Sequence, residues 1–246
     1  LKTSVQPVNL LNTPELRVKK ETPVVQKLQK YSASGSEYLS PSVISQYIEC
    51  PMRFYYDKIA GIKEVEEITE EADARIFGKI FHEVLENYYK PLKAKTISAD
   101  TVNSWLNDTS LIEKRINEAF ASQMGPHSGS QLEGKNILIF EVLKNYIIQF
   151  FKKEKELAPF VFIDAERKVK QTYATQSGVR INLGGTIDRL HRKDGMLYII
   201  DYKTGSGTSQ IASLENLFET KKHKENKAIF QTLLYGLLIN PEEDGA

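Results

Sequence analysis

The feature that most constrains this sequence is Asp194-Gly195, which lies between an alternating run at residues 179–188 and a second strand-like run at 196–203. An Asp-Gly pair is favoured in two-residue type I′ hairpins because both central residues need a positive φ. A loop of these two residues sets the register, so that Leu190 faces Ile199 and Asp188 faces Asp201. The sequence therefore predicts two carboxylates directly opposite one another.

Two opposed carboxylates need compensation, because like charges on facing strand positions are destabilising. A hard divalent cation shared by both groups is the simplest compensation. A shared proton, with one raised pKa, is the alternative. Lys203 lies two residues after Asp201 and so points to the same face. It either balances the charge, or orients a water molecule and stabilises charge that develops on a phosphate.

Length and composition indicate one large α/β domain, since 246 residues with 41% hydrophobic and 26% charged residues are ordinary for a globular protein. The net charge of +1 argues against a wholly basic nucleic-acid coat. The lysine clusters at 152–155 and 221–224 are either local DNA tracks or solvated helix faces. Cys50 is the single cysteine, which favours a reducing, cytoplasmic setting. We expect no membrane span, because no apolar run approaches ~20 residues.

Local patterns divide the chain into helices, a strand meander and a final helix. Residues 1–36, with three prolines, are interpreted as a linker or strand-like extension, and 37–246 as the domain. Helices are predicted at about 40–56, 71–89, 111–124, 134–156 and 225–239, and strands at 160–169, 179–190 and 196–203. This order predicts a three-layer α/β domain. Because the chain starts at Leu1 without a methionine, we expect a fragment of a longer protein.

Several motifs together resemble the RecB/AddB-type nuclease domain of the PD-(D/E)xK superfamily. They are residues 185–189 (GTIDR), 199–205 (IIDYKTG), 78–86 (GKIFHEVLE), 231–235 (QTLLY) and the entry helix 40–56. The similarity spans residues 38–239. It implies a restriction-endonuclease-like three-layer fold, with a central mixed β-sheet flanked by helices and an additional helical insertion.

The resemblance also implies a set of site residues. The metal ligands would be His82, Asp188, Asp201 and the backbone carbonyl of Tyr202. The catalytic set would be Lys203, Asp188, Asp201, Gln231 and Tyr235. Arg53, Arg189 and Tyr235 are candidates for contacts with the DNA backbone. Glu166 is a further acid that could lie near the metal, although its place in the strand alternation is not evident.

The implied activity is hydrolysis of DNA phosphodiesters with Mg²⁺, or alternatively Mn²⁺. By resemblance the chain is an exonuclease from a helicase–nuclease that processes DNA ends in recombinational repair. The alternative is a catalytically silent DNA-binding or subunit scaffold, which would be expected to lack an acid or the lysine. Some relatives add three distal cysteines to a residue matching Cys50 to hold an iron–sulfur cluster. With one cysteine, we expect no cluster in these 246 residues: either the protein lacks one, or its distal ligands lie elsewhere in a longer protein. We interpret Cys50 as a buried thiol.

Overall fold

The computed structural model describes residues 17–63, 72–125, 132–205, 208 and 210–240. The α-helices are α1 (Thr22–Leu28), α2 (Pro41–Glu49), α3 (Pro51–Phe54), α4 (Ala74–Tyr89), α5 (Ala99–Asn107), α6 (Thr109–Met124), α7 (Lys135–Leu157) and α8 (Thr220–Leu238). Short helical turns are η2 (Gln29–Tyr31), η3 (Tyr55–Ala60), η4 (Lys90–Leu92) and η6 (Leu214–Leu217). The strands are β1 (Thr96–Ile97), β2 (Phe160–Ala174), β3 (Arg180–Lys193) and β4 (Met196–Ile200). The predicted α/β class is confirmed.

The four strands form one sheet in the order β1-β2-β3-β4, and all three pairings are antiparallel. The expectation of a mixed sheet is therefore corrected for the described strands, where parallel pairing is confined to an isolated bridge between Leu39 and Leu183. The reason is connectivity, since parallel neighbours need a long crossover and β2, β3 and β4 follow one another through tight hairpins.

The β3–β4 hairpin has the predicted turn and register. Asp194 and Gly195 adopt φ values of 51° and 77°, as a type I′ turn requires. Leu190 pairs with Ile199, and the last pair of the ladder is Arg189 with Ile200. Asp188 and Asp201 come next along the two strands.

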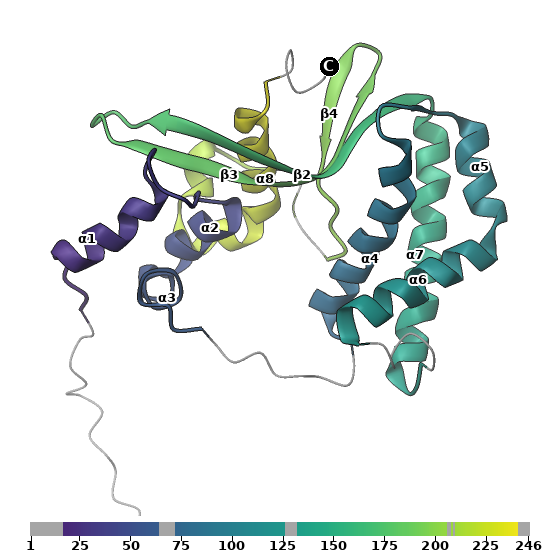
Figure 1. The fold of residues 1–246 in the computed structure, drawn as a ribbon, viewed down its shortest axis with the longest axis horizontal. Coiled ribbons are helices and arrows are strands. Elements are labelled where there is room, and N and C mark those ends of the chain that lie inside the picture. The colour runs from purple at the N-terminus through teal and green to yellow at the C-terminus, as the bar shows by residue number, and fades with distance from the viewer. Residues whose placement is uncertain (1–16, 64–71, 126–131, 206–207, 209, 241–246) are drawn as a thin grey trace, which may run out of the picture.

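Helices cover the sheet in two groups (Figure 1). Helices α4–α7 form a bundle at one end of the sheet, and α2 and α8 contact each other beneath the long β2–β3 hairpin. The larger core lies in the α4–α7 bundle and includes Trp105, Phe151 and Phe162. A smaller core joins α8 to β2 and β3 through residues such as Tyr235 and Ile187. The helical insertion is thus α5–α7, of which α5 was not predicted.

The N-terminal expectation is corrected in part. Residues 1–16 lie outside the described residues, but residues 22–31 are helical rather than a linker or strand. Tyr31 is buried, and the side-chain amide of Asn182 donates to the carbonyl oxygen of Ser32 at 2.6 Å. This segment therefore packs on the domain.

Among the residues that the structure describes, every helix is too short or too polar to cross a bilayer.

Candidate active site

Three acidic residues lie in a row across adjacent strands. Glu166 in β2 lies between two residues that pair with the neighbours of Asp188 in β3, so these two acids are opposite one another. Asp201 directly follows β4, and the backbone N–H of Tyr202 donates to Asp188 Oδ2 at 2.6 Å. The hairpin register thus brings the end of β4 alongside Asp188, as the Asp-Gly turn predicted.

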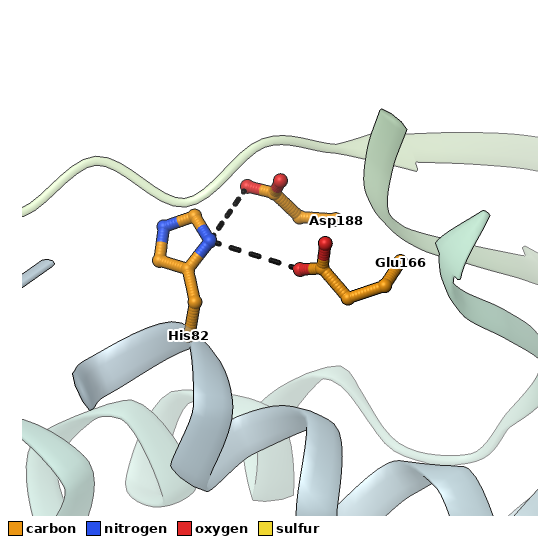
Figure 2. A group of neighbouring side chains, drawn as sticks. All are labelled: His82, Glu166 and Asp188. Atoms are coloured by element: carbon orange, nitrogen blue, oxygen red, sulfur yellow. Dashed lines mark ion pairs between the residues drawn. The ribbon is translucent and has the colours of Figure 1, made fainter. Parts of the chain in front are cut away.

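His82 of α4 faces two of these acids (Figure 2). Its Nδ1 lies 3.5 Å from Asp188 Oδ2 and 3.9 Å from Glu166 Oε1. One ligand atom from each of these three side chains, His82, Glu166 and Asp188, lies within 4.8 Å of the other two. The opposite ring nitrogen, Nε2, is 3.1 Å from the carbonyl oxygen of Tyr202. His82 is therefore oriented by the same segment that the sequence predicted as part of the metal site.

The donor chemistry of this group fits a divalent cation. The two carboxylates suit hard ions such as Mg²⁺ and Mn²⁺, and the imidazole nitrogen adds a donor that is common for divalent transition metals. Burial raises the pKa of Asp188 to about 6. The positive charge of His82 and the hydrogen bond from the Tyr202 N–H lower this pKa, and the negative charges of Asp201 and Glu166 raise it. Burial alone would lower the pKa of His82, but Glu166 and Asp188 outweigh it and raise that pKa. The cluster is short of positive charge, which a divalent ion would provide.

Glu166 reaches this group through an unusual backbone conformation. Its φ is +49°, in the left-handed region that residues with a Cβ rarely adopt. The β2–β3 register also shifts between Phe162 and Asp164. A bulge changes which face later residues occupy, so simple alternation along β2 could not place Glu166. The signal that could have found it is its position opposite Asp188.

Asp201 is not part of the group formed by His82, Glu166 and Asp188. Its Oδ2 forms an ion pair with Lys203 Nζ at 2.6 Å, and its Oδ1 accepts a hydrogen bond from Gln231 Nε2 at 2.8 Å. Of the expected metal ligands, the structure therefore brings together His82 and Asp188, places the Tyr202 carbonyl on the His82 ring, and adds Glu166. Asp201 differs because a nearby ammonium is its strongest partner.

Gln231 of α8 links the lysine to a buried tyrosine. Lys203 Nζ donates to Gln231 Oε1 at 3.1 Å, and Gln231 Nε2 also donates to the hydroxyl oxygen of Tyr235 at 3.2 Å. Tyr235 is only 3% exposed, and burial raises its pKa to about 12. A Cβ added to Gly185 would lie 2.7 Å from the tyrosine ring, so this close approach requires glycine. These contacts hold Gln231 against the Asp201–Lys203 pair.

Arg189 does not reach the surface, so its expected contact with DNA is corrected. It is 1% exposed, and its Nη1 and Nη2 donate to the two oxygens of Glu154 in α7 at 2.5 and 3.0 Å. Its guanidinium also lies over the rings of Tyr89 and Phe160. The partners of Arg189 come from α4 and α7, so its side chain belongs to the core on the bundle side of the sheet, whereas Ile187 and Leu190 pack toward α8.

Arg53 and Cys50 lie near the start of α3. Arg53 is exposed and lines a cavity of about 640 Å³, and Gln231 and Tyr235 line the same cavity. Cys50 is exposed too, which corrects its interpretation as a buried thiol. Its sulfur accepts a hydrogen bond from the Arg53 backbone N–H at 3.4 Å and caps α3. The helix start, not core packing, accounts for its place.

Comparison with known proteins identifies the family. The PD-(D/E)XK nuclease superfamily matches residues 38–245. An uncharacterized protein of Rickettsia felis is 28% identical over 189 residues, which cover 72% of this chain and 20% of that protein. An uncharacterized protein of Rickettsia conorii is 27% identical over 190 residues, with 73% and 20% covered. The chain thus spans about a fifth of the length of these curated relatives. With an α/β fold of the restriction-endonuclease-like type and an acidic site beside a lysine, the chain belongs to the PD-(D/E)XK nuclease superfamily.

Proposed function

We propose that this chain is a metal-dependent deoxyribonuclease domain that hydrolyses DNA phosphodiesters. The observation that carries the proposal is the junction of two clusters. His82, Glu166 and Asp188 form a group suited to a divalent cation, and Asp188 is next to the segment that carries Asp201 and Lys203. A cation-binding group beside an accessible ammonium suits a reaction at a phosphate.

The cation would be held by His82, Glu166 and Asp188. Asp201 and the Tyr202 carbonyl, which the resemblance also gives as ligands, would join them if Asp201 exchanged Lys203 for the cation and the carbonyl left the His82 ring. Mg²⁺, or alternatively Mn²⁺, would supply positive charge against the phosphate and lower the pKa of a water molecule. The Tyr202 N–H and its carbonyl orient Asp188 and His82, which fixes two of the donors relative to each other.

Lys203 is the residue that we assign to the reacting phosphate. Its side chain is 47% exposed, whereas that of its partner Asp201 is 5% exposed. Asp201 and Gln231 restrain the ammonium at distances of 2.6 and 3.1 Å. A restrained cation at the surface can stabilise negative charge as it develops on the phosphoryl oxygens. Tyr235 acts on this arrangement by holding Gln231 in place.

The wider biological role extends this proposal. The motifs resemble those of RecB/AddB-type nucleases, which favours an exonuclease that works with a helicase in DNA end processing and recombinational repair. The relatives are several times longer than this chain, so there is room for a helicase region in such proteins. A single cysteine is typical of the cytoplasmic setting in which such an assembly would act.

End-labelled linear single- and double-stranded DNA, incubated with Mg²⁺, Mn²⁺ or EDTA, tests the activity. We expect release of nucleotides with either metal and none in EDTA, and loss of cleavage in Asp188→Asn and Lys203→Ala. Arg180→Gln, an exposed change on the β2–β3 hairpin, is the control. Metal binding without cleavage under every condition, including addition of a helicase partner, would support a silent scaffold instead.

A further inference from the structure

A polar cavity adjoins the proposed catalytic residues on the side of α8. It has a volume of about 640 Å³ and lies between α2, the α3–η3 segment and α8. Gln231, Tyr235, Gly185 and Thr186 form the part of its wall nearest the site. The cavity therefore reaches Gln231, which contacts Lys203.

A second hollow reaches the site from the side of α4. Its volume is about 690 Å³, and its lining includes His82, Glu166, Arg75 and Lys79. The two cavities have no lining residue in common. The segment after β4 lies between α4 and α8 (Figure 1), since Gly78 faces Thr204 and Lys203 contacts Gln231. The acids Glu166, Asp188 and Asp201 therefore have one cavity on the side of α8 and the other on the side of α4.

Among the described residues that line the α2–α8 cavity, one cation has no ion-pair partner. Glu49 pairs with Lys227 at 2.5 Å. Asp57 pairs with Lys58 at 2.9 Å and also accepts a hydrogen bond from Gln46. Arg53, by contrast, has no ion pair among the described residues, although it lines the same cavity. An arginine that is exposed and unpaired suits bidentate contact with a phosphate.

We propose that this cavity is a nucleotide subsite, in which Arg53 pairs with a phosphate of the DNA strand next to the bond that is cleaved. The inference rests on the proposed nuclease function. Pockets of ~300–1,000 Å³ hold ligands of nucleotide size, so the cavity has room for the sugar and phosphate beside the scissile bond. The serine and glutamine side chains of α2 would contact the sugar–phosphate backbone, which carries no sequence information.

Binding without cleavage tests the subsite separately from the activity. The affinity of the 246-residue chain for fluorescein-labelled oligo(dT) is measured in EDTA over a range of salt concentrations. Loss of one phosphate contact on single-stranded DNA lowers the slope of log K against log salt by about 0.7. For Arg53→Gln this corresponds to about fivefold weaker binding at 0.1 M salt. Arg53→Lys should keep the slope, because it keeps the charge.

The matched control is Arg180→Gln, which removes an exposed arginine outside both cavities and should leave the slope unchanged. Equal midpoint temperatures of thermal unfolding for all variants verify that they are folded. An unchanged slope in Arg53→Gln would overturn the subsite even if the native chain cleaves DNA. A reduced slope would support it even if the isolated chain is inactive, so the two proposals fail separately.

The source of the phosphate is resolved by changing the DNA. Oligonucleotides with a 5′-phosphate, a 3′-phosphate or two hydroxyl ends are compared with circular single-stranded DNA. An effect of Arg53→Gln that requires a phosphorylated end assigns the subsite to a terminal phosphate. An equal effect on circular DNA assigns it to an internal phosphodiester. Equal affinity of native and Arg53→Gln protein for every one of these DNAs would overturn the proposal.

Discussion

Two cation–carboxylate pairs in this molecule have opposite surroundings. Arg189 and Glu154 are 2% and 7% exposed in their side chains, and aromatic rings cover the guanidinium. Lys203 and Asp201 are 47% and 5% exposed. Both pairs adjoin the same acidic row, because Arg189 follows Asp188 in β3 and Lys203 follows Asp201 after β4.

The difference indicates that the Arg189–Glu154 pair stabilises the fold and that the Lys203–Asp201 pair is accessible to substrate. Both terminal nitrogens of Arg189 donate to Glu154, and this joins α7 to β3. The Lys203 ammonium has three N–H donors, and its contacts to Asp201 and Gln231 use two. Within the described part of the chain, the third donor has no partner and can bind a phosphate oxygen. The buried pair therefore holds the strand in place, and the exposed pair can bind substrate.

The largest effect is expected for Arg189→Ala. Removing one partner of a buried pair leaves Glu154 charged and uncompensated, which lowers the free energy of unfolding by about 3–5 kcal/mol. Urea denaturation followed by circular dichroism measures this. Arg189→Lys should recover only part of the loss, because lysine cannot make the bidentate contact. A loss below about 1 kcal/mol in Arg189→Ala would remove the distinction between the two pairs.

Lys203→Ala should act on the reaction instead. Loss of one group that stabilises transition-state charge reduces kcat by about 10²–10³-fold. Steady-state cleavage of labelled DNA measures it. Arg180→Gln should retain native kcat. A kcat within threefold of native in Lys203→Ala would contradict the role assigned to the exposed pair.

The row of acids formed by Glu166, Asp188 and Asp201 should make the free energy of unfolding depend on pH when no metal is bound. The folded-state pKa of Asp188 is about 6, above the ordinary 3.8, so its contribution to stability is present below about pH 4 and is lost as the pH rises through 6. The pKa of His82 is also raised, so its contribution too is lost as the pH rises past 6.5. The free energy of unfolding in EDTA should fall by roughly 2–3 kcal/mol from pH 4.5 to 8.

The control for this pH dependence is Asp188→Asn, whose stability in EDTA should change less over the same range. Mg²⁺ should restore stability above pH 6 in the native chain, because it replaces the missing positive charge. A native profile that rises with pH in EDTA would contradict the electrostatic description of the row.

The smallest effect is expected for the stability of Lys203→Ala. Half-exposed ion pairs contribute about 1 kcal/mol or less, since solvent screens them. The same urea denaturation used for Arg189→Ala compares the two pairs directly. A loss as large as that of Arg189→Ala would show that Lys203 supports the fold as much as the reaction.

The sequence could predict the part of the site that depends on local rules. The positive φ that both turn residues need identified Asp194-Gly195, and the turn determined which β3 residues face β4. Ser40 before Pro41 likewise predicted the start of α2, where the Ser40 hydroxyl accepts from the Val43 N–H. These features depend on neighbours in sequence, so they are accessible without a structure.

Contacts between distant segments could not be predicted in the same way. Arg189 follows Asp188 directly in β3, but nothing local identifies Glu154 of α7 as its partner. The bulge in β2 hid the position of Glu166, and the short helix α1 follows a proline-containing segment without a sustained period. The mixed sheet came from the resemblance, whereas tight hairpins make the β2–β3 and β3–β4 pairings antiparallel.

The left-handed backbone of Glu166 sets fold stability against activity. A residue with a Cβ in that conformation costs roughly 1–2 kcal/mol relative to glycine. Glu166→Gly should therefore relieve strain and carboxylate repulsion, while it removes a side chain from the His82 group. Selection for thermostability alone would tend to discard this glutamate, and selection for DNA cleavage would retain it. Variants of this domain that become more stable at position 166 should become poorer enzymes.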